Sequence, residues 1–194
     1  MIMLASQSTI RQQILQAAGV SFEAETSLFD EVAARILMQR MSPKSIAQEL
    51  AVGKALAVAA KHPQKLVIGA DQVLEVEGNI LGKPENISDA RRQLQMLRGK
   101  THQLHSAVCV CKNREIMWHT TDTAVLSMRI FSDEFLETYL LSEAEQLATS
   151  VGGYKIEGKG LQLFDKIVGD YFTILGLPLL PLLAYFRQTA IIPS

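Results

Sequence analysis

The sequence predicts an α/β fold in which helices flank a mixed sheet. Short apolar runs alternate with amphipathic helical patterns in the first half of the chain, which is typical of strands separated by helices. Two strand-like segments joined by a polar turn near Asn113 then indicate a hairpin. The 194 residues, 48% hydrophobic and 20% charged, are enough to bury one core. We therefore expect residues 1–194 to form a single domain.

The first predicted elements are a buried strand at residues 2–5 and a helix from Ser8 to about Ala18. Ser8 suits the N-cap position, and Gly19 suits the end of the helix because a left-handed residue often follows one. Arg11 lies in the first turn. An anion at this end of the helix would contact both the loop and Arg11.

A second helix is predicted over residues 42–61, where Ser42 supplies the capping hydroxyl and Pro43 occupies the first helical position. Lys54 falls in line with apolar residues four and eight positions earlier, so it lies on or beside the buried stripe. Two interpretations stay open. Its stem packs while its ammonium reaches water, or its ammonium enters a cleft and binds phosphate.

The next strand, KLVIGADQV at residues 65–73, is predicted to place Asp71 at its carboxyl end. In sheets flanked by helices, ligand crevices form at that edge. Lys83 follows in the sequence GKP. A carboxylate and an ammonium suit a magnesium-bound polyphosphate, because the acid holds the metal and the lysine contacts phosphate. The alternative is a turn at the end of a strand with a solvated lysine.

The elements after residue 85 are predicted from N-cap residues and from the alternation of apolar and polar residues. Ser88 is expected to cap a third helix that Gly99 ends. Residues 101–130 should form the hairpin, and Ser132 should begin a helix whose first turn is acidic. The apolar run at residues 175–186 is too short to span a bilayer, so we expect a docked helix and no membrane partner.

Charge and cysteine content narrow the class of protein. The formal charge of −1, from 19 Lys plus Arg and 20 Asp plus Glu, argues against a protein that binds nucleic acid through general basicity. Cys109 and Cys111 are one residue apart in an extended segment, which makes a disulfide between them implausible. The first residues, MIMLAS, lack the features of a signal peptide. We therefore expect reduced cysteines in a cytoplasmic protein.

Eight segments, in this order and spacing, resemble the Maf family of nucleoside triphosphate pyrophosphatases. They are ASQSTIR at 5–11, DE at 30–31, LAVGKA at 50–55, GADQV at 69–73, GKP at 82–84, RGKTH at 98–102, GGYKIEG at 152–158 and GLPL at 176–179. The resemblance implies a Maf/ITPase-like fold with a mixed, twisted sheet and two lobes around a deep cleft, and a homodimer. It also implies that Mg²⁺ or Mn²⁺ assists hydrolysis of a nucleoside triphosphate to a monophosphate and pyrophosphate.

The resemblance carries roles to matching positions. Asp71 would be the central catalytic acid, taking a proton from the attacking water, and Glu31 would hold the metal or orient the water. Both are therefore expected metal ligands, and Lys83 is expected to assist catalysis. The residues expected to hold the triphosphate are Ser8, Arg11, Lys54 and Lys83.

The chain departs from the family pattern at three places, one of which is Ser106-Ala107 where the family has Thr-Gly. Residues 8–11 read Ser-Thr-Ile-Arg where the family has Ser-Pro-Arg-Arg, so Ile10 replaces one arginine and phosphate binding by Arg11 alone should be weaker. Thr173 stands where the family has Asn, which leaves the role of that position open.

Gln72, Lys155 and Glu157 make the chain similar to the branch associated with 7-methyl-GTP. Methylation makes the purine cationic, so Glu157 would offer a compensating charge and Gln72 would supply amide hydrogen bonds. The alternative for Lys155 and Glu157 is a solvated surface pair. Two other functions stay open: a pyrophosphatase for dTTP, UTP or other noncanonical nucleotides, and a nucleotide-binding regulator of cell division without turnover.

Overall fold

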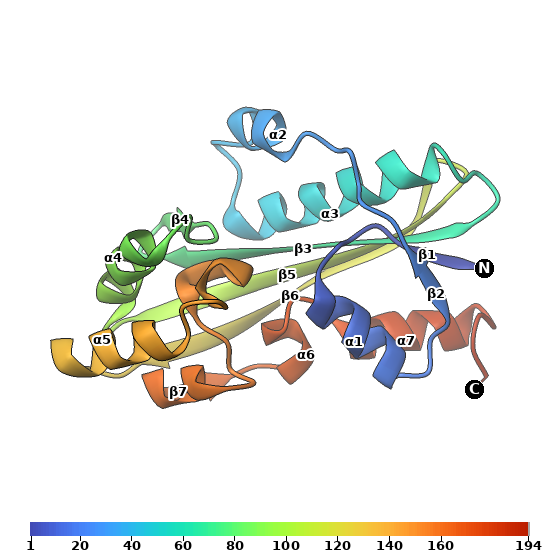
Figure 1. Cartoon of the computed structure of the whole chain (residues 1–194). Coiled ribbons are helices and arrows are strands. Elements are labelled where there is room, and N and C mark those ends of the chain that lie inside the picture. The colour runs from blue at the N-terminus through green and yellow to red at the C-terminus, as the bar shows by residue number, and fades with distance from the viewer. Residues whose placement is uncertain (194) are drawn as a thin grey trace. The chain divides into compact units, whose positions relative to one another are not determined.

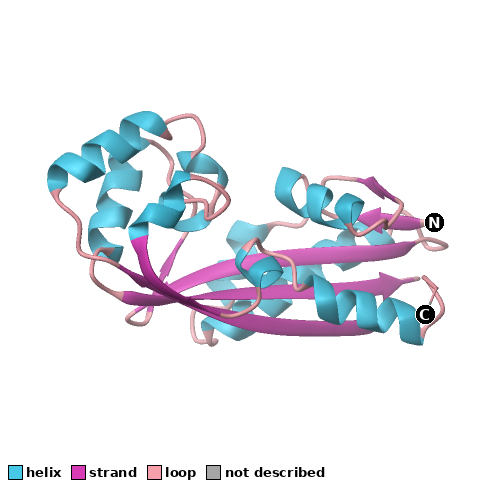
Figure 2. Cartoon of the chain, turned by 90° about the horizontal axis from the view of Figure 1, so that it is seen from below, coloured by secondary structure: helices cyan, strands magenta, loops and turns pink. Residues whose placement is uncertain are grey.

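The computed structural model describes residues 1–193 and contains a seven-stranded mixed sheet with helices against it (Figures 1 and 2). The strand order is β2-β1-β3-β5-β6-β7, and β4 pairs with β3. Strand β1 (Ile2–Leu4) runs parallel to β2 (Phe22–Ala24) and β3 (Leu66–Val76), whereas β4 (Asn79–Leu81) runs antiparallel to β3. The predicted α/β class with a mixed sheet is confirmed.

The chain divides into two compact units. The first comprises Met1–Gln72, His105–Thr123 and the residues from Asp170 onward, and the second comprises Val73–Leu104 and Ala124–Gly169. The long strands β3, β5 (Thr101–Lys112) and β6 (Glu115–Met128) contribute residues to both units. The two lobes and the deep cleft stay predictions.

The first unit packs helices on both faces of its strands (Figure 1). Helix α3 (Pro43–Ala59) covers one face, and α1 (Thr9–Ala17) and α7 (Leu179–Gln188) cover the other. The core on the second face is apolar, because β1, β3, α1 and α7 all turn aliphatic or aromatic side chains toward it. It includes Leu4, Leu15, Ile68, Val108 and Phe186.

The second unit contains β4, β7 (Phe164–Val168), α4 (Ile87–Leu97) and α5 (Asp133–Ser142). Helix α4 packs against α5 and against the short 3₁₀ helix η2 (Val151–Gly153). The other 3₁₀ turns are η1 (Leu147–Thr149) and η3 (Lys159–Leu163). Strand β7 is antiparallel to β6.

Most predicted helix starts and turns are confirmed, because caps act locally. Ser42 accepts a hydrogen bond from the Ser45 N–H, and Ser132 accepts one from the Phe135 N–H. Ser8 occupies the N-cap position of α1, although its side chain makes no capping hydrogen bond. The hairpin turn falls at Asn113-Arg114, and both residues have positive φ.

Two sequence-based predictions are wrong in detail. Strand β3 continues to Val76, so Asp71 lies within the strand and not at its carboxyl end; pairing with β4 sustains the strand beyond the predicted end. Helix α4 is capped by Asn86, whose side chain accepts from the Asp89 N–H at 2.9 Å, and not by Ser88. The docked helix predicted in the apolar run at residues 175–186 is confirmed as α7, which begins at Leu179; the short helix α6 (Tyr171–Ile174) precedes the run, and Gly176, where φ is +95°, lies between the two helices.

The two cysteines are buried and free, and their Sγ atoms lie 3.5 Å apart on one side of β5. Among residues 1–193, no helix combines the length and apolar character needed to cross a membrane.

A buried histidine in the second unit makes the stability of the fold sensitive to pH. His102 is 1% exposed and its Nε2 lies 2.6 Å from the Tyr154 hydroxyl. Burial lowers the pKa of His102 from 6.5 to about 4. Between these two pH values the unfolded chain binds a proton at His102 and the folded chain does not. The free energy of unfolding therefore falls as the pH drops from 6.5 toward 4.

We expect the free energy of unfolding to fall by about 2 kcal/mol more in the wild type than in His102→Gln between about pH 7.5 and about pH 5. Urea unfolding at the two pH values measures the difference. His119→Gln, at an exposed histidine, should behave like the wild type. Equal losses of unfolding free energy in all three proteins would contradict a lowered pKa of His102 as the cause.

Candidate active site

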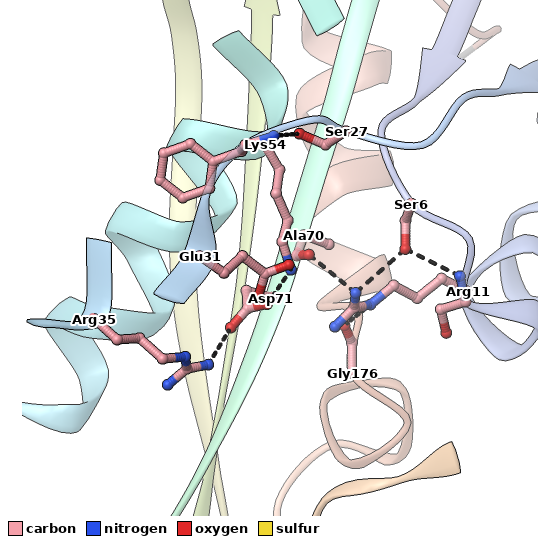
Figure 3. A network of polar contacts seen from close by, with 11 residues as sticks. Ser6, Arg11, Ser27, Glu31, Arg35, Lys54, Ala70, Asp71 and Gly176 are labelled. Atoms are coloured by element: carbon pink, nitrogen blue, oxygen red, sulfur yellow. Dashed lines mark hydrogen bonds and ion pairs between the residues drawn. The ribbon is translucent and has the colours of Figure 1, made fainter. Parts of the chain in front are cut away.

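A cluster of charged side chains surrounds Asp71 in the first unit (Figure 3). Two glycines bring the segments of this cluster together. A Cβ on Gly69 would overlap the backbone oxygen of Ala51, so glycine is what allows α3 to lie so close to β3. A Cβ on Gly53 would overlap the Phe29 ring, which precedes α2 (Glu31–Leu37). Small residues at these two points therefore place α2 and α3 beside Asp71.

Lys54 joins two carboxylates. Its Nζ lies 2.5 Å from Asp71 Oδ1 and 3.0 Å from Glu31 Oε1. The side chains of Lys54 and Asp71 are only 12% and 7% exposed, whereas that of Glu31 is 42% exposed. The inner pair is therefore largely removed from water, and Glu31 stands at the solvent side of the cluster. The interpretation of Lys54 as a solvated lysine is wrong, because its ammonium is held by acids.

The two neighbouring acids Asp30 and Glu31 have different partners. Asp30 caps α2, and its Oδ1 accepts a hydrogen bond from the Ala33 N–H at 2.9 Å. Glu31 is the first residue of α2 and faces Lys54. A carboxylate in the first turn also suits the helix dipole. Of the two acids, Glu31 is therefore the one that reaches the cluster.

Arg35 is a member of the cluster that was not predicted from the sequence. It lies four residues after Glu31, so both side chains project from one side of α2. Its Nη2 is 3.6 Å from Asp71 Oδ2, and its side chain is 39% exposed. Asp71 Oδ2 is buried and has no hydrogen-bond donor within residues 1–193. The signal that would have revealed Arg35 is its spacing from Glu31, once a helix is recognised there.

Arg11 binds backbone rather than the carboxylates. Its Nε donates to the Gly176 carbonyl at 2.8 Å, and its Nη1 donates to the Ala70 carbonyl at 2.9 Å and to Ser6 Oγ at 3.4 Å. Burial lowers the pKa of Arg11, and the charges of Asp71 and Glu31 oppose that shift. Arg11 therefore ties the residue before Asp71 to the loop between α6 and α7 (Figure 3).

The side-chain amide of Gln72 is hydrogen-bonded within the first unit. Its Nε2 lies 2.9 Å from Ser106 Oγ, 3.2 Å from the Thr173 carbonyl and 2.9 Å from the Ile174 carbonyl. The Thr173 hydroxyl donates to Asp122 Oδ2 at 2.7 Å, which gives this departure from the family pattern a partner inside the unit. Ser8 contributes its N–H to Ser6 Oγ at 3.2 Å.

The structure thus assembles Asp71, Glu31 and Lys54 directly, with Arg11 held to the carbonyl just before Asp71. Lys83, Lys155 and Glu157 belong to the second unit, so their roles stay predictions. Lys155 Nζ donates to Gln146 Oε1 at 3.1 Å, and the Glu157 side chain is exposed.

The donor set suits a divalent cation that the substrate helps to hold. Mg²⁺ is commonly bound by one or two carboxylates together with substrate phosphates and water. Asp71 Oδ2 is a buried acceptor without a donor in the described part of the chain, and Glu31 stands beside it at the solvent side. Within residues 1–193, no group of three or more His, Cys, Asp or Glu is placed to hold a metal. Protein groups would therefore supply only part of the coordination shell.

Comparison with known proteins gives close relatives over the whole length. The family model described as Maf-like protein matches residues 1–189. A nucleoside triphosphate pyrophosphatase of Caulobacter vibrioides is 49% identical over 96% of this chain and 94% of that protein. A 7-methyl-GTP pyrophosphatase of Bartonella henselae is 42% identical over 98% of this chain and 96% of that protein. A 7-methyl-GTP pyrophosphatase of Brucella abortus is 43% identical over 96% of this chain and 95% of that protein.

Gly69→Ala tests whether close contact between α3 and β3 builds the site. The added methyl group would overlap the backbone of α3, which cannot move as easily as a side chain end. We expect a loss of about 2–3 kcal/mol in the free energy of unfolding, measured by urea denaturation. Gly82→Ala is the matched control, because a Cβ there meets no atom within 4 Å. A loss no greater than that of the control would contradict the proposed contact.

Proposed function

Because the chain belongs to the Maf family, we propose that it hydrolyses a nucleoside triphosphate to the monophosphate and pyrophosphate. The observation that carries the proposal is the buried Asp71 carboxylate, paired with Lys54 and adjoined by Glu31 and Arg35. Such a site can accept a proton from water and also neutralise phosphate charge. Relatives at 49% and 46% identity carry the name nucleoside triphosphate pyrophosphatase, which supports the same reaction here.

In the proposed reaction, Asp71 accepts a proton from the water that attacks the α-phosphorus. The new bond joins the water oxygen to that phosphorus, and the bond to the bridging oxygen breaks. Pyrophosphate leaves with the electron pair of that bond. Lys54 lies against the base and stabilises negative charge that develops on the phosphate oxygens. Glu31 orients the water from the solvent side of the cluster.

We propose Mg²⁺ or Mn²⁺ as the cofactor, held by Asp71 and Glu31. When bound, it would neutralise phosphate charge and polarise the reacting phosphoryl group. Lys54 bridges the same two acids, so its ammonium would have to share them or turn toward phosphate. Lys83 and Ser8 are proposed as further phosphate contacts. We further propose that the protein is cytoplasmic, forms a homodimer and binds no nucleic acid. Light scattering with size-exclusion chromatography tests the homodimer.

For the substrate we propose 7-methyl-GTP. Relatives that carry the name 7-methyl-GTP pyrophosphatase are 42% and 43% identical to this chain, which supports the choice. Glu157 would face the cationic base and Lys155 would contact the nucleotide, with the amide oxygen of Gln72 as a further acceptor. A panel of triphosphates that includes 7-methyl-GTP, GTP, dTTP, UTP and inosine triphosphate, assayed for pyrophosphate release, decides among the candidates. Binding without release from any of them would favour a regulator.

Asp71→Asn should lower turnover by about 10² to 10⁴-fold, because the amide keeps the shape of the carboxylate but cannot accept the proton. Pyrophosphate release measures the effect, and circular dichroism verifies the fold. Asp165→Asn, at an exposed aspartate of β7, is the matched control. Near-normal release by Asp71→Asn would remove Asp71 from the role of base.

Glu157→Gln should lower kcat/KM for 7-methyl-GTP by about five-fold more than for UTP, since one exposed charge contributes about 1 kcal/mol to recognition of a cation. Glu145→Gln, at another exposed glutamate of the second unit, is the control. Steady-state kinetics with both substrates measures the change. Equal effects on the two nucleotides would contradict a role in reading the base.

A further inference from the structure

The three cations near Asp71 differ in the donors that they have left for a ligand. Lys54 is 12% exposed and contacts two carboxylates. Arg11 donates hydrogen bonds to backbone carbonyls through its Nε and Nη1. Arg35 is 39% exposed and approaches Asp71 through one nitrogen only. Of these three side chains, Arg35 is therefore the one that an incoming anion can reach most easily.

The contact between Arg35 and Asp71 is loose. Its Nη2 lies 3.6 Å from Asp71 Oδ2, which is longer than a hydrogen bond. In the described chain this oxygen accepts no hydrogen bond, so Arg35 is held to Asp71 by the ion pair alone. An ion pair with one partner this exposed contributes little to stability. Exchange of this partner for a phosphate oxygen would therefore cost the fold little.

The guanidinium is nonetheless held in the right place. Glu31, one helical turn earlier on α2, is anchored by Lys54 at 3.0 Å, and Asp30 caps the same helix. These contacts orient the side of α2 from which Arg35 projects (Figure 3). A planar guanidinium also presents paired donors that match two oxygens of a phosphate, which a lysine cannot do.

We propose that Arg35 binds the leaving pyrophosphate portion of the substrate, exchanging Asp71 for phosphate oxygens when the nucleotide binds. This inference rests on the proposed function. Lys54 and Arg35 together balance the charges of Asp71 and Glu31, so a triphosphate needs cationic groups that can turn toward it. The exchange also releases Asp71 Oδ2, which accepts no hydrogen bond in the described chain, from its ion pair with Arg35.

Arg11 does not fill this role, although it is the basic residue of the 5–11 segment. Its half-buried guanidinium links the Ala70 and Gly176 carbonyls, and turning it toward a phosphate would break both hydrogen bonds. Losing two hydrogen bonds from a charged donor costs more than losing the single long contact of Arg35. Of the two arginines, Arg35 is therefore the one whose present contact is more readily exchanged for phosphate oxygens.

The test compares Arg35→Ala and Arg35→Lys with Arg40→Ala, which removes an exposed arginine just beyond α2. We expect Arg35→Ala to raise both KM for the triphosphate and the inhibition constant of pyrophosphate by about 10-fold. Arg35→Lys should recover part of the loss, and Arg40→Ala should match the wild type. Circular dichroism and thermal unfolding verify that each variant folds, and Arg35→Gln replaces the alanine variant if that variant does not.

Two results would overturn the proposal. One is a KM and a pyrophosphate inhibition constant within about two-fold of the wild type in Arg35→Ala. The other is a fall in kcat with both constants unchanged, which would mean that Arg35 acts only through Asp71. If the wild type released no pyrophosphate, the proposed reaction would fail separately. Calorimetry with tripolyphosphate, wild type against Arg35→Ala, would then still decide whether Arg35 binds polyphosphate.

Discussion

The ion pair between Lys54 and Asp71 is the interaction on which the site depends. Removing an ammonium and a carboxylate from water costs several kcal/mol per ion before their attraction repays it. Both side chains are nearly buried and their charged atoms are 2.5 Å apart, so the pair exists only because α3 lies directly against β3. Apolar residues at the two positions would pack with less cost. Retention of two charges there is accordingly better explained by chemistry than by stability.

The surroundings of the pair show how a fold holds charged groups ready for a ligand. Gly69 permits the close approach of α3, and Gly53 makes room for Phe29 ahead of α2. Arg11 fastens the strand at Ala70 to the Gly176 loop. Each support uses buried backbone or packing rather than exposed contacts. Electrostatic catalysis needs this kind of preorganisation, because charges that must first rearrange lose much of their effect.

The two arginines of this region have different partners, which suits them to different tasks. Arg11 is half-buried, desolvation of its guanidinium lowers its pKa, and its donors meet carbonyl oxygens. Arg35 is partly exposed and faces a carboxylate at a distance too long for a hydrogen bond. The first arrangement stiffens the strand that carries Asp71. The second leaves a cation available to a ligand.

Local sequence signals determined much of this protein: the α/β class, the hairpin turn at Asn113 and the caps at Ser42 and Ser132 depend on neighbouring residues alone. The order of short motifs also indicated the family, which the match over residues 1–189 confirms. Tertiary structure decided what depends on distant partners. Pairing with β4 extended β3 beyond Asp71, and packing near Gly53 placed the short helix α2, whose seven residues carry too weak a local signal to be recognised. Arg35 entered the site for the same reason, since ion pairs form between side chains that only the folded chain brings together.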